Sequence, residues 1–304
     1  MMRNKTALPQ LALFAAAIIW GSSFVVMKDT VDIFSTNTIL ALRFGTGALL
    51  LALVFMKRLR AINIDYIKKG AVVGIFTYLG YVFQTYGLMS TTPGKNAFLT
   101  AIYCVLVPFL SWLLYKKKPD KYNIIAAFVC LVGVGLISLK GNLTIGIGDL
   151  LTLIGGVLFT FQVVTLSEGS QGKDIIPFSV IVFATAFIPS LIMALLFEQF
   201  PAVIPTGTYW GMAFLIIFPT CVSLCLQAYG QRGTPATMAS LILCLESVFG
   251  AITSLIVGQE KMSLRLGAGF IVIFVAVVIS ETKLSFLKKK KPALNSEEAG
   301  TERQ

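Results

Sequence analysis

The sequence predicts an all-α integral membrane protein with ten transmembrane helices, arranged as an inverted five-plus-five repeat. Three observations lead to this fold class: a low content of charged residues, a series of long apolar runs, and a similarity between the two halves. Of the 304 residues, 56% are hydrophobic and only 13% are charged. A soluble domain usually carries roughly a quarter charged residues, so we expect most of this chain to lie in lipid.

Ten apolar runs approach the length of about 20 residues that a helix needs to cross the hydrocarbon core of a bilayer. Charged residues lie well inside two of them, Arg43 in the second and Glu246 in the ninth. We expect the first run to remain as a membrane span, because it continues beyond the length of a signal-peptide core. The ten runs are residues 11–27, 38–56, 70–89, 96–115, 123–139, 150–166, 177–197, 209–230, 235–257 and 266–282.

The positive charges predict the orientation of these spans. With a cytoplasmic N-terminus, nineteen Lys and Arg residues fall in cytoplasmic segments and five in outer loops. Positively charged loops stay on the cytoplasmic side, so both termini are expected there, in a multi-pass protein of the cell (inner) membrane. The net charge of +11 comes from short clusters between apolar runs, which argues against nucleic acid as a partner.

The two halves of the chain resemble each other. QTYGLMSTTP at 84–93 returns as QAYGQRGTP at 227–235. At an offset of 142 residues, further matches follow: Thr92-Pro93 with Thr234-Pro235, Ala126 with Ala268, and Phe128 with Phe270. The predicted units are therefore residues 1–140 and 145–283, followed by a charged cytoplasmic tail at 284–304. Because five spans are an odd number, the second unit enters the membrane from the opposite side. Such inverted repeats suit a transporter that works by alternating access.

Two local patterns carry structural expectations. Thr92 and Thr234 each precede a proline, and threonine followed by proline favours a helix start, so both are expected to cap their spans. Gly70 and Gly74 form a GxxxG pattern, which permits close packing of membrane helices.

Several motifs resemble a known family. The stretches WGSSFVVMK at 20–28, LRFG at 42–45, and LESVF followed by GQE at 245–260 are similar to the EamA-type branch of the drug/metabolite transporter superfamily. The resemblance covers about residues 11–282. It implies ten helices with both termini cytoplasmic and a central cavity lined by helices one, three, four, six, eight and nine. It also implies export of small metabolites, often amino acids or amines. The family often has proline after the glutamate of the ninth span, where this chain has Ser247.

The two intramembrane charges are the first candidate site residues. A charge at mid-span costs roughly 2.5–3.5 kcal/mol on insertion scales, so Glu246 and Arg43 are expected to face protein or water. Glu246 either binds a substrate ammonium or a coupling proton, or is a structural acid that pairs with Arg43. Arg43 either clamps a substrate carboxylate or pins its helix to neighbouring groups.

Uncharged polar and aromatic residues complete the candidate substrate site. We expect them to shape a pocket for a solute with polar and apolar parts, with ordinary helix packing as the alternative. The resemblance implies that Trp20 of the first span faces the cavity. These candidates are Trp20, Tyr78, Tyr81, Gln84, Gln162 and Gln227.

The composition narrows the function further. The chain has no histidine and its five cysteines all lie in apolar runs, so we expect no catalytic residues, no metal and no cofactor. Small-molecule substrate and lipid bilayer are the expected partners, with a homodimer left open. An exporter of amino acids or amines is favoured. The alternatives are a transporter of a lipid-linked or nucleotide sugar and, less favoured, a membrane-embedded lipid-modifying enzyme.

Overall fold

The computed structural model describes residues 7–91, 93–138, 146–257 and 263–282, and every regular element in these ranges is a helix. The predicted unit boundaries at 140 and 145 and the predicted tail at 284–304 lie outside them. In chain order the helices are α1 (Ala7–Val31), α2 (Thr36–Val54), the 3-10 helix η1 (Met56–Ala61), α3 (Ile64–Ser90), α4 (Pro93–Thr100), α5 (Tyr103–Tyr115), α6 (Lys121–Ser138), α7 (Ile147–Gly169), α8 (Ile175–Phe197), α9 (Thr206–Leu215), the π-helix η2 (Ile216–Val222), α10 (Ser223–Gly233), α11 (Ala236–Leu243), α12 (Glu246–Ile256) and α13 (Leu264–Thr282).

Every predicted apolar run coincides with one of these helices or with consecutive helices. Within the described ranges, eight segments are long and apolar enough to cross a membrane, whereas Lys121–Leu136 and Gly267–Ser280 are shorter apolar helices. The chain is therefore a multi-span helical membrane protein, and the count of ten stays a prediction for those two helices. The eight segments are Ala7–Val31, Thr36–Val54, Ile64–Ser90, Asn96–Tyr115, Ile147–Gly169, Ile175–Phe197, Thr206–Gly233 and Ala236–Thr253.

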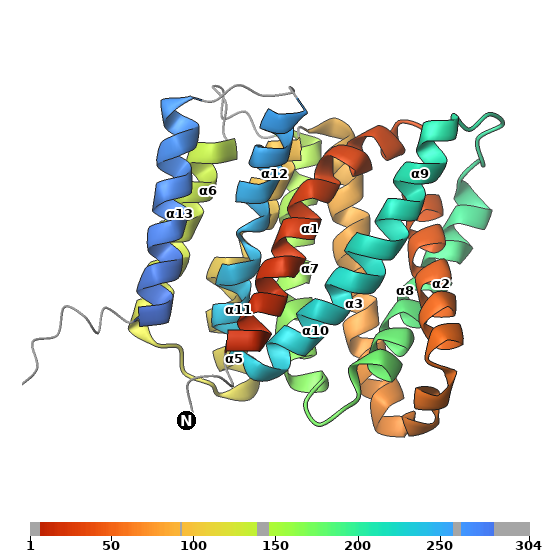
Figure 1. Ribbon diagram of the computed structural model, residues 1–304, viewed down its shortest axis with the longest axis horizontal. Coiled ribbons are helices and arrows are strands. Elements are labelled where there is room, and N and C mark those ends of the chain that lie inside the picture. Colours follow the sequence, from red (N-terminus) through yellow and green to blue (C-terminus); the bar gives the residue numbers. More distant parts are fainter. Residues whose placement is uncertain (1–6, 92, 139–145, 258–262, 283–304) are drawn as a thin grey trace, which may run out of the picture.

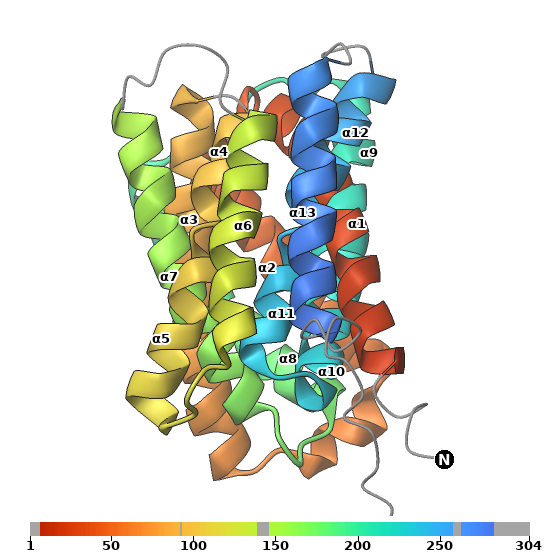
Figure 2. The same ribbon diagram turned by 90° about the vertical axis from the view of Figure 1, so that its left-hand side faces the viewer.

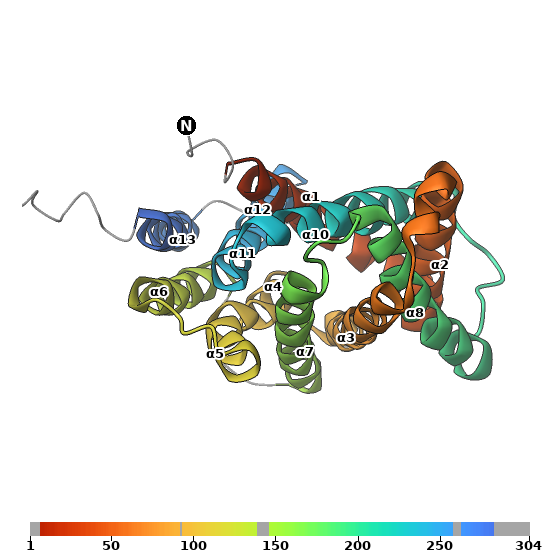
Figure 3. The same cartoon turned by 90° about the horizontal axis from the view of Figure 1, so that it is seen from below.

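The helices stand roughly parallel in an elongated bundle (Figure 1). Seen from below, α6, α5, α7 and α3 form one row, and α13, α11, α12, α1 and α10 form a second row that faces it (Figure 3). The pair α6 and α13 stands at one end of the bundle (Figure 2), and α2 packs on α8 at the other. The space between the rows is where residues from both halves of the chain meet.

Two spans that the sequence predicts as continuous helices are broken near their middle. The span 96–115 turns at Ala101 and Ile102, and the span 235–257 turns at Cys244 and Leu245. At each break the backbone tightens into i to i−3 hydrogen bonds, such as Cys104 N to Ala101 O (3.0 Å) and Ser247 N to Cys244 O (3.1 Å). An offset of 143 residues brings the two breaks into register. Short 3-10 segments inside a helix often mark a hinge.

A third irregularity lies in the eighth predicted span, where α9 passes through the π-helix η2 into α10. Pro219 stands inside η2, and proline cannot donate the hydrogen bond that a regular helix requires at its position. Widened helical turns of this kind occur often at functional sites.

The prediction that Thr234 caps a helix is wrong. Helix α11 begins at Ala236, and Pro235 occupies the cap position with φ −55° and ψ 143°. The proline ring pushes the preceding residue into an extended conformation, so Thr234 ends α10 instead, with φ −132° and ψ 131°. In the first half α4 begins at Pro93 as expected, and Thr92 lies outside the described residues.

The GxxxG prediction is confirmed by the packing of α3 on α8. A Cβ atom at Gly70 would lie 2.7 Å from Ile181 Cγ2, and one at Gly74 would lie 2.7 Å from the carbonyl oxygen of Val182. Both separations are too short for non-bonded contact. The absence of side chains at these two positions lets the helices approach closely.

We expect Gly74→Ala to lower the free energy of unfolding by about 1–3 kcal/mol, because the added methyl group must displace backbone of α8. The matched control is Gly207→Ala in α9, where a Cβ would meet nothing within 4 Å. The measurement is the thermal unfolding midpoint of each purified variant in detergent. A Gly74→Ala protein that melts at or above the wild-type midpoint would contradict this account.

Glu198, the residue that follows α8, holds the first turn of α2. Its Oε1 accepts hydrogen bonds from the backbone N and the Nδ2 of Asn37, both at 2.9 Å. Its Oε2 accepts from the backbone N (2.7 Å) and the Oγ1 (3.0 Å) of Thr38. These backbone groups belong to the turn whose N–H groups have no partner within the helix. Burial alone would raise the pKa of Glu198, but the hydrogen bonds from Asn37 and Thr38 outweigh it and lower the pKa below its ordinary value.

This clamp predicts a pH-dependent stability. Because the folded-state pKa of Glu198 is lowered, its contribution is complete above the unfolded-state pKa of about 4.3. It is lost as the pH falls through the folded-state value. We expect Glu198→Gln to cost about 0.5–2 kcal/mol of unfolding free energy at pH 7, as loss of a helix cap does. The difference from wild type should shrink below pH 4, as followed by thermal unfolding in detergent. An equal difference at both pH values would rule out the clamp.

Candidate functional site

A cavity between the two rows of helices collects most of the predicted site residues. Its empty volume is about 740 Å³, including the part open to solvent. It is lined from α1, α3, α4, α5, α7, α10, α11 and α12, with Arg43 added from α2. Seven of the eight predicted residues line it: Trp20, Arg43, Tyr81, Gln84, Gln162, Gln227 and Glu246.

Tyr78 is the predicted residue that the described lining of this cavity does not include. Its hydroxyl instead donates a 3.0 Å hydrogen bond to Oδ1 of Asn37, beside Glu198. The grouping of Tyr78 with Tyr81 and Gln84 on one helix side overlooked the helical rotation. Two steps of three residues turn the side chain by about 120° around the axis, which carries Tyr78 toward α2.

Glu246 is the first residue of α12, directly after the break that ends α11. Its side chain is 6% exposed. The hydroxyl of Tyr103 donates a hydrogen bond to Oε1 at 3.4 Å, which is long for this type of bond. Among the residues that the structure describes, no cation pairs with this carboxylate. The acid is thus held in the cavity wall with one weak donor.

Arg43 is the cavity's buried cation, 3% exposed. Its Nε donates to Oγ1 of Thr220 in η2 at 2.9 Å, and its Cζ lies 4.9 Å from the ring centre of Tyr81. The described part of the chain offers it no carboxylate, so it does not form the predicted alternative pair with Glu246. A guanidinium has five N–H donors, and the single bond to Thr220 leaves most of them available to a ligand.

The amide and indole groups of the site join helices. Gln162 of α7 and Gln227 of α10 exchange reciprocal amide hydrogen bonds of 3.1 and 3.2 Å. Gln84 Nε2 donates to Thr100 Oγ1 at 3.1 Å. Trp20 Nε1 donates to the carbonyl oxygen of Pro219 in η2 at 2.9 Å. In this conformation these groups fulfil the helix-joining alternative, while their remaining surface faces the cavity.

Sequence reasoning missed two polar residues of the lining, Tyr103 and Asn96. Tyr103 stands opposite Glu246 and matches it at the 143-residue offset of the helix breaks, a signal that the 142-residue alignment obscured. Asn96 donates from Nδ2 to the carbonyl oxygen of Gln84 (3.0 Å) and to Thr152 Oγ1 (2.8 Å). Its buried Oδ1 has no hydrogen-bond partner within the described ranges, so this acceptor is available to a ligand.

Comparison with known proteins adds a family match. The model of the EamA-like transporter family matches residues 8–139 and 146–282. An uncharacterized transporter of Archaeoglobus fulgidus is 33% identical over 271 residues, which are 88% of this chain and 84% of that protein. The uncharacterized transporter YyaM of Bacillus subtilis is 28% identical, over 86% of this chain and 90% of its own.

Two further similarities extend over nearly the whole chain. The uncharacterized inner membrane transporter YedA of Escherichia coli K12 is 22% identical over 99% of this chain and 100% of its own length. A solved crystal structure superposes with a TM-score of 0.76 at 17% identity, over 92% of this chain and 98% of that one. At this identity the superposition shows the fold alone.

Proposed function

Because this chain belongs to the EamA-like transporter family, we propose that it exports a small amine-bearing metabolite, such as an amino acid, by alternating access. The observation that carries the substrate class is the buried carboxylate of Glu246 in the cavity wall, without a cationic partner among the described residues. A substrate ammonium supplies the missing charge. A coupling proton can occupy the same carboxylate when the substrate has left, so the two cations compete for one site.

An inverted repeat of units 1–140 and 145–283 would provide the mechanical basis. Two pairs of contacts support it. A Cβ at Gly87 would meet Thr152 Oγ1 and the carbonyl oxygen of Gly148, whereas one at Gly230 would meet Leu13 and the carbonyl oxygen of Pro9. The offset of 139 that pairs Trp20 with Phe159 also pairs Pro9 with Gly148 and Leu13 with Thr152. The same helix contact thus recurs in both units, at opposite ends of the bundle.

The irregular segments identify where the helices would bend during alternating access. The two breaks, at Ala101 and Ile102 and at Cys244 and Leu245, lie beside Tyr103 and Glu246 of the cavity. The π-helix η2 supplies the groups that bond Trp20 and Arg43. Discontinuous helices often surround transporter substrate sites. A substrate at Glu246 would therefore contact one hinge directly and a second through Arg43.

The alternatives fit this cavity less well. A nucleotide sugar or lipid-linked sugar is a bulky anion and favours several cations, whereas Arg43 is the one cationic side chain in the described lining. Family membership indicates transport rather than lipid modification. The cell (inner) membrane, with both termini on the cytoplasmic side, is the location and orientation that the positive charges favour.

The test is a comparison of extracellular metabolites from cells that express this protein and cells that carry an empty vector. Accumulation of one amine or amino acid outside the expressing cells is the expected result. Inverted membrane vesicles loaded from the outside with the same compound give the direction independently. If no amine distinguishes the two cell lines, while a phosphorylated sugar or its lipid-linked form does, the substrate class proposed here is wrong.

A further inference from the structure

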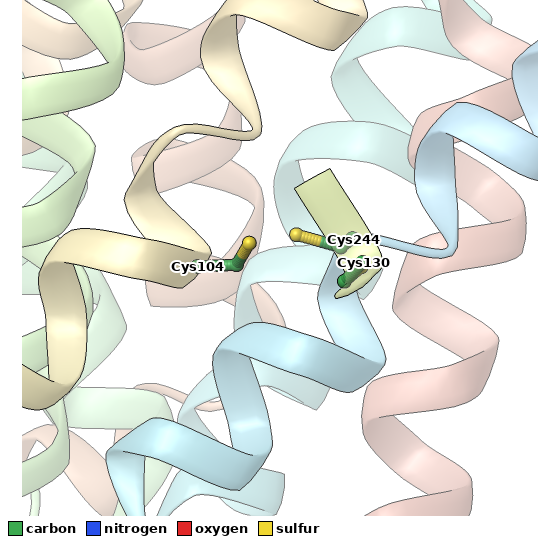
Figure 4. A group of neighbouring side chains, drawn as sticks. All are labelled: Cys104, Cys130 and Cys244. Atoms are coloured by element: carbon green, nitrogen blue, oxygen red, sulfur yellow. The ribbon is translucent and has the colours of Figure 1, made fainter. Parts of the chain in front are cut away.

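We propose that Cys104, Cys130 and Cys244 form a binding site for one soft monovalent cation, Cu(I). The three cysteines come from α5, from α6 and from the break between α11 and α12. Figure 4 shows the three side chains gathered in one place, with the sulfur of Cys104 directed toward the other two residues. The three Sγ atoms all lie within 4.8 Å of one another.

The ligand set selects the class of metal. Soft sulfur ligands favour Cu(I), zinc and iron–sulfur clusters over hard cations. A structural zinc site is almost always tetrahedral with four ligands, and the described residues supply three here. Three sulfurs form a trigonal site, which suits a cation of low coordination number. With metal–sulfur bonds of about 2.3 Å, the sulfurs need only small side-chain adjustments to reach one metal.

Burial argues for a single positive charge. All three cysteines are fully buried, at 0% exposure, where an uncompensated charge is costly. When a monovalent cation binds, one S–H bond breaks, the proton leaves, and the electron pair of that sulfur forms the metal–sulfur bond. The site then keeps its net charge, while the other two sulfurs coordinate through lone pairs. A divalent cation would require the loss of two protons for the same balance.

The thiols give up little when the metal binds. Cys104 Sγ donates to the carbonyl oxygen of Ala127 at 3.7 Å, and Cys244 Sγ donates to that of Ala101 at 3.8 Å. Thiols are weak donors, so these bonds are readily exchanged for metal coordination. The contact between Cys244 and Ala101 also joins the two helix breaks. A bound metal would therefore connect one break to the other.

The cavity provides a route to the site. Tyr103 and Leu243 line the cavity, and each directly precedes one of the cysteines in the chain. A cation that enters the cavity is thus separated from the thiols by a wall one residue deep, at the positions where the helices bend.

The first experiment measures binding without reference to transport. The reduced full-length protein in detergent is titrated with Cu(I) under anaerobic conditions, and retained copper is measured after gel filtration. We expect one equivalent for the wild type and for the control Cys221→Ala/Cys225→Ala, which keeps the three proposed ligands. Cys130→Ser should retain less than a tenth of an equivalent. Equal retention by Cys130→Ser, or loss in the control, would overturn the proposal.

A second measurement needs no variant and covers the case in which Cys130→Ser fails to fold. The wild-type protein is treated with a small alkylating reagent during partial denaturation, with and without Cu(I), and each cysteine is read by mass spectrometry. Cu(I) should protect Cys104, Cys130 and Cys244 at least tenfold relative to Cys221 and Cys225. Uniform protection, or none, would show that the cluster is packing only.

The functional consequence rests on the proposed transport activity. If the breaks move against each other during alternation, Cu(I) should inhibit export, and Cys104→Ala should relieve the inhibition. Stoichiometric copper binding without inhibition would leave the site intact and remove this consequence. Inhibited export without bound copper in the wild type would remove the site and leave the transport proposal standing.

Discussion

Replacing Glu246 with glutamine is expected to reduce export about 30-fold or more at low substrate concentration, with little change in the amount of folded protein. Glutamine has nearly the same shape and keeps an oxygen that can accept the bond from Tyr103. It removes the charge that would pair with an ammonium in a desolvated site. Loss of one partner from such a buried pair costs about 2–5 kcal/mol. The readout is the initial rate of export at equal membrane abundance.

The matched control is Glu168→Gln. Glu168 also lies in a helix but forms an ion pair with Lys117 near the surface, away from the described lining of the cavity. This variant should export at the wild-type rate. Full export by a well-expressed Glu246→Gln protein would remove Glu246 from the substrate site.

An exchange assay separates the two roles of Glu246. If the carboxylate binds the substrate ammonium, Glu246→Gln loses substrate exchange as well as net export. If it carries only the coupling proton, the variant keeps exchange of labelled for unlabelled substrate but loses the dependence of export on a pH gradient. Each outcome assigns one role.

Replacing Arg43 with glutamine is expected to separate substrates by whether they carry a carboxylate. The guanidinium is buried, and the described residues offer it no acid, so a substrate carboxylate can pair with it bidentately. We expect the KM for an amino acid to rise about 30-fold or more, by the same 2–5 kcal/mol. The KM for the corresponding amine without a carboxylate should change less than threefold. Competition for uptake into inverted vesicles measures both values.

Arg43→Lys is the informative companion variant. Lysine keeps the charge but loses the planar fork of donors, so it should restore only part of the affinity for the amino acid. If the two Arg43 variants impair both compounds equally, the residue has a structural role through Thr220 and Tyr81. The substrate carboxylate must then be bound elsewhere or be absent.

The sequence predicted the location of the helices well, because an apolar run long enough for a bilayer has few alternatives to a helix. It did not predict the breaks at Ala101 and Cys244. No proline or glycine stands at either position, so the local pattern is that of a continuous helix. The break places Glu246 at a helix start rather than in the middle of a straight helix, a difference that composition and spacing do not carry.

The site shows the same division. Arg43 and Glu246 were recognisable because a charge in an apolar run is costly wherever the helices pack. The facing of uncharged residues depends on helix rotation, which the sequence constrains weakly, and this is why Tyr78 faces α2 while Tyr81 lines the cavity. The cluster of Cys104, Cys130 and Cys244 depends on contacts between three separate helices. Each of these cysteines, taken alone in its run, has the pattern of an ordinary buried residue.

The single carboxylate in the described lining of the cavity has a consequence for membrane voltage. If Glu246 alternates between a proton and a simple amine cation, the loaded and returning states carry equal charge, and turnover is insensitive to voltage. A zwitterionic amino acid adds no net charge, so the protonated return moves one charge inward. That charge is worth about 2.3 kcal/mol per 100 mV. The response of export to an imposed potential would therefore report the class of cargo before its identity is known.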